Sequence, residues 1–230
     1  MKNFVKKKVI IFDLDETLYS EIDYVISGFK VVAEYLECKY KLIDKKSFQS
    51  LKAILDKDGR GKVFDTFLQR NNIFSQTELK KCLSIYRSHQ PNISLYNSAK
   101  LYLKKNYKEK SLYLVTDGNK ITQEKKIKSL NIEEFFKKIF ITHRYGIKNA
   151  KPSLHCFEII KKIEGCDWAD MIYIGDDPTK DFVSLNEVGA HTVRLLKGRL
   201  SKKEVTKVFD AKYKINDIEE LEKIPIFYED

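Results

Sequence analysis

The chain has 230 residues, of which 43% are hydrophobic and 12% aromatic; this is enough apolar material for a folded core and excludes a disordered protein. No apolar run approaches the ~20 residues that span a bilayer, and four scattered cysteines without a C-x-x-C pair argue against a disulfide framework or a zinc site, so we expect a cytoplasmic protein without a membrane partner. The net charge of +10 comes mainly from lysines spread along the chain, without a binding motif, and we therefore do not expect nucleic acid to be the main partner.

The first expected element is a buried strand over residues 9–12, VIIF, which is followed directly by Asp13 and Asp15. In an extended segment, the side chains of residues two apart point the same way. Burying two carboxylates together is costly unless a cation compensates, and Mg²⁺ suits one or two carboxylates together with waters and a substrate phosphate. The alternative is a strand that ends in an ordinary polar turn, and this segment alone does not decide between the two.

A long stretch of helical periodicity separates this strand from the next one. Helices are expected over residues 21–37, 47–55 and 62–70, and a fourth helix is expected from Ser75, where Ser75 and Glu78 fit a capping box. A structureless loop of this length would be unusual inside a compact domain. The stretch is therefore interpreted as an inserted helical subdomain.

The insertion divides the chain into a helical subdomain at residues 19–90 and a core domain made of residues 1–18 and 91–230. Arg60 lies in a flexible basic loop, DKDGRGK, which either reaches an anionic substrate or is a surface turn. Tyr19 follows the first strand closely enough to line a cleft, and its alternative role is packing at a hinge.

Strands alternate with helical patterns in the rest of the chain. Buried strands are expected over residues 112–116, 138–142, 171–175 and 191–196, and helices over residues 121–129, 153–163 and 179–188. Such alternation implies crossover connections and a parallel sheet covered on both faces. We therefore predict an α/β fold, a Rossmann-like parallel sheet with helices on both faces and an inserted α-helical cap, with its ligand site at the carboxyl ends of the strands.

Polar residues also stand at the end of the expected strand at residues 112–116 and beyond the expected strand at residues 138–142. Thr116 ends a strand and is followed by Asp117 and Gly118 at the start of a helix, a combination that offers a hydroxyl and backbone N–H groups to an anion. Lys151 precedes Pro152, which is expected to start a helix and to hold the lysine in a fixed approach. The alternatives are an ordinary strand-to-helix turn and a surface lysine.

Three carboxylates follow the strand at residues 171–175, namely Asp176, Asp177 and Asp181. They would repel one another unless they hold a cation or a lysine. Helix capping could explain Asp177 and Asp181, but it explains Asp176 poorly.

The motifs D-x-D-x-T, T, K-P and G-D-D-x-x-x-D occur here in that order, each at a predicted strand end or just beyond one. In this combination the sequence resembles the haloacid dehalogenase superfamily of phosphohydrolases, and the resemblance extends over nearly the whole chain. It includes a helical insert in the first cap position. Two segments depart from the commonest pattern: T-D-G-N replaces T-N or S-N before Gly, and Arg144 lies where many relatives carry an acidic residue.

The resemblance implies the roles of the paired aspartates. Asp13 would be the nucleophile that forms an aspartyl-phosphate, and Asp15 would act as general acid and then as general base. Mg²⁺ would be bound by the Asp13 carboxylate, the Asp15 backbone carbonyl and Asp176.

The resemblance also implies a phosphate site. Thr116, the N–H groups of Asp117 and Gly118, and Lys151 would bind phosphate oxygens. Asp177 or Asp181 would act through waters or by holding Lys151, and Thr17 would be a further supporting residue.

The expected function is Mg²⁺-dependent hydrolysis of a small phosphorylated metabolite, either a sugar phosphate or a nucleoside monophosphate. Dehalogenases proper do not share an aspartate at the position of Asp15, so this residue favours phosphoryl transfer. Two alternatives remain, a phosphotransferase or phosphomutase and a non-catalytic binding protein. The latter would be expected to have lost Asp13, Asp15 or Lys151, and all three are present. The oligomeric state is left open.

Overall fold

The computed structural model describes residues 8–227. The chain separates into two compact units: one comprises the chain up to Glu21 and from Ser94 onward, and the other is Ile22–Ile93. The role of the second unit as a cap over the active site stays a prediction.

The first unit is built on a parallel sheet. Within the described residues it contains six strands in the order β3-β2-β1-β4-β5-β6, and every neighbouring pair is parallel. The strands are β1 Val9–Phe12, β2 Ser111–Thr116, β3 Lys138–Ile141, β4 Met171–Gly175, β5 His191–Leu195 and β6 Tyr213–Ile215. This sheet confirms the predicted α/β fold class and the five predicted strands.

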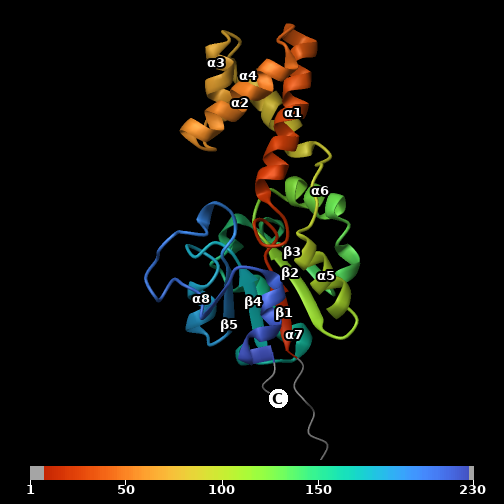
Figure 1. Ribbon diagram of the computed structural model, residues 1–230, viewed down its shortest axis with the longest axis vertical. Coiled ribbons are helices and arrows are strands. Elements are labelled where there is room, and N and C mark those ends of the chain that lie inside the picture. The colour runs from red at the N-terminus through yellow and green to blue at the C-terminus, as the bar shows by residue number, and fades with distance from the viewer. Residues whose placement is uncertain (1–7, 228–230) are drawn as a thin grey trace, which may run out of the picture. The chain divides into compact units, whose positions relative to one another are not determined.

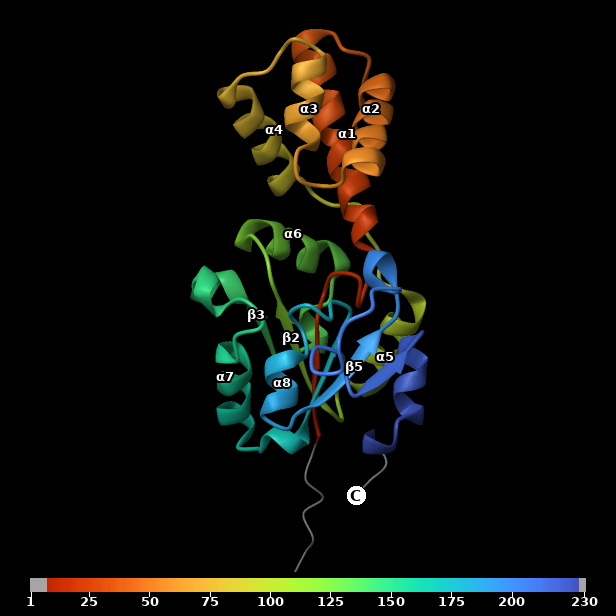
Figure 2. The same ribbon diagram turned by 90° about the vertical axis from the view of Figure 1, so that its left-hand side faces the viewer.

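Helices cover both faces of the sheet (Figures 1 and 2). They are α5 Asn97–Asn106, α6 Lys120–Leu130, α7 His155–Glu164 and α8 Val183–Glu187. On one face, Ile11 of β1 belongs to a buried cluster with Phe157 of α7 and Leu185 of α8. On the other face, the Phe12 ring contacts the Tyr102 ring of α5 edge to face. Because neighbouring residues of β1 point to opposite faces, both faces of this strand are apolar.

Short 3₁₀ helices complete this unit. They are η1 Glu133–Phe135, η2 Thr142–Tyr145, η3 Ile147–Asn149, η4 Trp168–Asp170, η5 Gly198–Leu200, η6 Ile218–Lys223 and η7 Pro225–Phe227. No helix among residues 8–227 has the length and apolarity that crossing a membrane would require.

The second unit consists of helices around a separate apolar core. They are α1 Glu21–Tyr40, which begins at the unit's boundary, α2 Asp44–Asp58, α3 Val63–Arg70 and α4 Gln76–Ser88. The core cluster includes Phe29, Leu51 and Phe67, one from each of the first three helices. Ser75 caps α4 as predicted, because its Oγ accepts a hydrogen bond from the Glu78 backbone N–H at 3.0 Å.

Two predicted helix starts are wrong. The helix after Lys151 begins at His155 and not at Pro152, because residues 151–152 form a turn. The helix expected from residue 179 begins at Val183, since the backbone N–H of Asp181 donates to the Asp177 carbonyl in a preceding turn. This turn brings Asp181 back toward the end of β4.

Candidate active site

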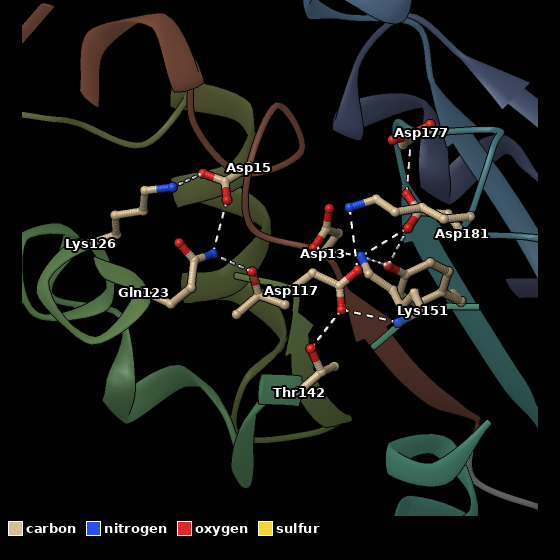
Figure 3. Close-up of polar contacts among 12 residues, drawn as sticks. Asp13, Asp15, Asp117, Gln123, Lys126, Thr142, Lys151, Asp177 and Asp181 are labelled. Carbon is tan, nitrogen blue, oxygen red and sulfur yellow. Dashed lines mark hydrogen bonds and ion pairs between the residues drawn. The ribbon is translucent and has the colours of Figure 1, made fainter. Parts of the chain in front are cut away.

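The sheet register brings the predicted site residues to one edge. Phe12 at the end of β1 pairs with Leu114 of β2 and with Ile174 of β4, so Asp13, Thr116 and Asp176 all follow at the carboxyl ends of adjacent strands. Figure 3 shows side chains from these segments and from α6 meeting there. Neighbouring parallel strands therefore bring together residues more than 100 positions apart in the chain.

Lys151 lies at the centre of the buried charges. Its Nζ is 2.9 Å from Asp13 Oδ1 and 2.8 Å from Asp181 Oδ1, and it also donates to the Tyr173 hydroxyl at 2.8 Å. Burial works against the charged ammonium, but Asp13 and Asp181 outweigh it and raise the pKa of Lys151 well above its usual value. Lys151 is thus buried as a cation and is not the surface residue of the alternative interpretation.

Three carboxylates form a compact group: Asp13, Asp176 and Asp181 each offer an oxygen, and these oxygens lie within 4.8 Å of one another. Burial raises the pKa of Asp13 to about 6, although Lys151 opposes the shift. Burial, together with the charges of Asp181 and Asp13, raises the pKa of Asp176 to about 9. Lys151 contacts Asp13 and Asp181, and an excess of negative charge remains around it when all three are ionised.

A divalent cation would neutralise this excess of negative charge. Oxygen donors of carboxylates are the ligands that hard cations prefer, and the donor set therefore fits such an ion. Asp181 belongs to this group and also binds Lys151, whereas the sequence placed it in a supporting position.

Asp15 lies in a different environment from Asp13. Its Oδ1 is 2.7 Å from Lys126 Nζ and accepts a hydrogen bond from the Tyr19 hydroxyl, and its Oδ2 accepts from Gln123 Nε2 at 2.9 Å. Burial would raise the pKa of Asp15, but the charge and hydrogen bond of Lys126 lower it below the usual value. The two aspartates of the first motif are therefore held by different cations.

Gln123 and Lys126 were missed by the sequence analysis. Both lie on α6 with the apolar Ile127 and are almost fully buried, although the sequence in this region is rich in lysine. The available signal was their position, three residues apart and on the same helical face as Ile127. Polar residues on the buried face of a helix need partners, and here the partner is Asp15.

The segment after β2 is held by hydrogen bonds of its own. Thr116 Oγ1 accepts from Gln123 Nε2 at 2.6 Å. Asp117 Oδ1 accepts from the Thr142 hydroxyl at 2.6 Å and from the Lys151 backbone N–H at 3.1 Å. Burial would raise the pKa of Asp117, but Lys151 and Lys180 lower it below its usual value.

The Lys180 ammonium, 3.4 Å from Asp117 Oδ2, offsets the negative charge of this carboxylate. Gly118 has a φ of +132°, a conformation that favours glycine over other residues. Phosphate binding by the N–H groups of Asp117 and Gly118 stays a prediction.

Other predicted residues lie at the margin of this cluster or outside it. Asp177 Oδ1 accepts from both the backbone N–H and the hydroxyl of Thr179, which is a turn-capping arrangement. Thr17 Oγ1 is buried and has no hydrogen-bond partner in the described part of the chain. Tyr19 is fully buried, and its contact with substrate stays a prediction.

Two arginines considered in the sequence have other surroundings within the structure described here. Arg60 belongs to the helical unit and lines a cavity of about 190 Å³ beside Phe29 and Phe64. Its contact with substrate stays a prediction. Arg144 forms an exposed ion pair with Glu124 at 3.0 Å.

Comparison with known families identifies the family of this chain. The model of the haloacid dehalogenase-like hydrolase family matches residues 10–195. The chain belongs to this family.

The hydrolase is similar to curated archaeal proteins over most of its length. It is 28% identical to the glyceraldehyde 3-phosphate phosphatase of Methanocaldococcus jannaschii over 222 residues, covering 93% of this chain and 95% of that protein. A protein of the same name from Methanopyrus kandleri is 22% identical over 207 residues, covering 84% of this chain and 85% of its own.

A solved structure shares the fold. It is that of the putative HAD-hydrolase YfnB from Bacillus subtilis bound to magnesium, with a TM-score of 0.67 and 19% identity, covering 95% of this chain and 98% of that chain.

Proposed function

We propose that this protein, a phosphatase of the haloacid dehalogenase-like family, hydrolyses a small sugar phosphate through an aspartyl-phosphate on Asp13. The observation that carries the proposal is the buried group in which Lys151 lies against Asp13 and Asp181 while Asp176 completes a set of oxygen donors. A nucleophilic carboxylate beside a fixed cation can approach a phosphate dianion that it would otherwise repel.

In the first half of the reaction, an Asp13 oxygen attacks phosphorus and the bond from phosphorus to the ester oxygen breaks. Asp15 delivers a proton to the leaving oxygen, so that an alcohol departs. The proton that Asp15 accepts from water in the second half replaces the one that it delivers here.

In the second half, Asp15 accepts a proton from a water molecule that attacks the phosphorus. The bond between phosphorus and the Asp13 oxygen then breaks and inorganic phosphate leaves. Thr116 and Lys151 bind the phosphate oxygens in both halves, while Lys180 and Asp117 form a neutral pair beside them.

Mg²⁺ is the divalent cation proposed for the carboxylate group. Asp13, Asp176 and Asp181 would hold it, together with the Asp15 backbone carbonyl, and Asp177 and Thr17 are proposed to support this arrangement. When bound, the ion neutralises negative charge on the carboxylates and on the substrate phosphate.

The proposed substrate is a triose phosphate, with glyceraldehyde 3-phosphate as the first compound to test. The support is that both curated relatives described above carry the name of a glyceraldehyde 3-phosphate phosphatase and align over most of this chain. Nucleoside monophosphates and transfer to a second substrate remain as competing outcomes of the test.

The test is a panel of phosphoesters scored by released inorganic phosphate with and without Mg²⁺. Glyceraldehyde 3-phosphate is expected to give the highest kcat/KM, and Asp13→Asn is expected to abolish release. The same substitution at the exposed Asp56 of α2 serves as the control and should leave the rate unchanged. Preference for a nucleoside monophosphate would contradict the substrate, and undiminished release by Asp13→Asn would contradict the mechanism.

A further inference from the structure

Helix α6 directs two buried polar side chains at Asp15. Gln123 is 1% exposed and Lys126 is 3% exposed, and they are three residues apart on the helix. A buried ammonium is costly unless it is paired, and the pairing here is with the Asp15 carboxylate at 2.7 Å. Figure 3 shows both side chains converging on Asp15 from the same helix.

The Asp15 carboxylate is held at both oxygens. Lys126 and the Tyr19 hydroxyl contact Oδ1, and Gln123 donates to Oδ2 at 2.9 Å. An ionised carboxylate has roughly four acceptor positions, so three donors leave about one free. A carboxylate fixed in this way presents one defined direction for exchanging a proton.

Gln123 also connects Asp15 to the proposed phosphate site. Its Nε2 donates both to Asp15 Oδ2 and to Thr116 Oγ1, the latter at 2.6 Å. Because the amide nitrogen carries two hydrogens, these two bonds use both. The Thr116 hydroxyl accepts the hydrogen bond from Gln123 with one of its lone pairs. Its own hydrogen can therefore be donated to another acceptor.

We propose that Lys126 and Gln123 are positioning residues that fix Asp15 for proton transfer to the leaving oxygen, with Gln123 also orienting the Thr116 hydroxyl. This inference rests on the proposed function and goes beyond it by assigning a role to α6. Neither residue is proposed to touch the reacting atoms: both act through Asp15, and Gln123 also acts through Thr116. The competing explanation is structural, namely that the two residues only attach α6 to the sheet.

The dependence of rate on the leaving group separates the two explanations. A 2,4-dinitrophenolate leaves without protonation, whereas a phenolate gains much more from a general acid. The parameter kcat/KM covers only the steps up to phosphoryl transfer to Asp13, so hydrolysis of the intermediate does not affect it. A defect in acid positioning therefore slows phenyl phosphate selectively, and a general loss of structure slows both compounds equally.

The test compares Lys126→Met with the parent on phenyl phosphate and 2,4-dinitrophenyl phosphate. For phenyl phosphate, kcat/KM is expected to fall by roughly 10- to 100-fold, within the range of general acid catalysis. For the dinitrophenyl ester it is expected to fall by less than about threefold, because no proton is needed. Asp15→Asn should show the same selectivity, and Lys126→Arg should recover part of the loss.

Two further variants keep the result interpretable. Gln123→Met preserves the side-chain volume and provides the answer if Lys126→Met fails to fold. It is expected to slow both esters, because Thr116 binds the phosphate of both, and to slow phenyl phosphate by a clearly larger factor. Lys128→Met on the exposed side of α6 is the matched control and should match the parent on both esters. Equal losses on the two esters, or no loss, would overturn the positioning role while leaving the phosphatase intact. A parent that releases phosphate neither from these esters nor from glyceraldehyde 3-phosphate would instead refute the proposed function.

Discussion

Gly175, the last residue of β4, shows how closely the charged side chains are packed. A Cβ at this position would lie 2.4 Å from Asp181 Oδ2 and 3.0 Å from Asp181 Cγ. The Asp181 carboxylate is fully buried and already binds Lys151 at 2.8 Å. Since it cannot move into solvent without losing this partner, the close approach requires a residue without a side chain.

Gly175→Ala is therefore expected to displace Asp181 and to weaken the proposed metal site. In the parent, Mg²⁺ at about 100 times its Kd should add ~2.7 kcal/mol to the free energy of unfolding, because it binds only the folded chain. The variant should need roughly tenfold more Mg²⁺ for the same rise in Tm. Thermal unfolding at increasing Mg²⁺ concentration measures this shift.

Gly61→Ala is the matched control for this prediction. A Cβ at Gly61 would meet nothing within 4 Å, and its backbone is not in the left-handed region. Its Mg²⁺ response should equal that of the parent. An unchanged response in Gly175→Ala would contradict the placement of Asp181 in the metal site.

At the scale of elements, Glu78 joins two helices of the second unit. It lies in the first turn of α4 and accepts hydrogen bonds from the Tyr35 hydroxyl at 2.7 Å and the Tyr40 hydroxyl at 2.8 Å, both from α1. It also contacts Lys39. Burial would raise the pKa of Glu78, but these hydrogen bonds lower it below the usual 4.5. The carboxylate thus stabilises the packing of α1 against α4 in its ionised form.

This arrangement predicts a loss of stability in acid. A carboxyl group whose pKa is lower in the folded chain contributes fully above its unfolded pKa and loses its contribution as the pH falls through the folded pKa. Glu78→Gln should be about 2 kcal/mol less stable than the parent at pH 7. It should also lose less stability than the parent between pH 5 and pH 3.

Urea unfolding across this pH range measures the difference. Glu34→Gln, at an exposed position of α1, is the control and should follow the parent. Parallel pH profiles for the parent and Glu78→Gln would contradict the role of the carboxylate.

At the scale of the molecule, the chain leaves its core at Glu21 and returns at Ser94. The two ends are adjacent, since Tyr19 pairs with Leu95 in a β-bridge and the Tyr96 backbone N–H donates to the Leu18 carbonyl at 2.9 Å. The apolar clusters of the two units share no residue. The buried cluster of Ile11, Phe157 and Leu185 contains no residue of the inserted unit among the described residues.

We expect the core to fold without the insert. Replacing residues 22–93 by a Gly-Gly linker should give a chain with a cooperative unfolding transition that still responds to Mg²⁺, because the carboxylate group lies entirely in the core unit. Circular dichroism during thermal unfolding, with and without Mg²⁺, is the measurement. Aggregation or a non-cooperative transition would contradict the independence of the core.

The sequence predicted the parts of the fold that depend on continuous apolar runs. VIIF and MIYIG became β1 and β4 because strands buried on both faces need such runs. β6 was missed because it has only three residues and its middle residue, Lys214, is exposed. Its position depends on pairing with β5, which no local pattern in this segment indicates.

The site residues differ in the same way: some are indicated by a local sequence pattern, and others depend on the tertiary structure. Asp13, Lys151 and Asp176 were identifiable because each follows a strand or its turn, and parallel strands gather such residues at one edge. Gln123 and Lys126 were not, because a lysine-rich helix is usually solvated and only the tertiary structure shows which lysine is buried. Separating Asp181 from Asp177 likewise required the turn that precedes α8.

The most direct test of the account is whether Asp13 carries the phosphoryl group during turnover. The enzyme is mixed with excess glyceraldehyde 3-phosphate and Mg²⁺, quenched in acid within one turnover, digested, and analysed by mass spectrometry. The account predicts one added phosphoryl group on the peptide that contains Asp13, lost when the substrate is exhausted before quenching and absent in Asp13→Asn. Release of inorganic phosphate by the parent without any phosphorylated Asp13, at a rate that Asp13→Asn matches, would contradict it.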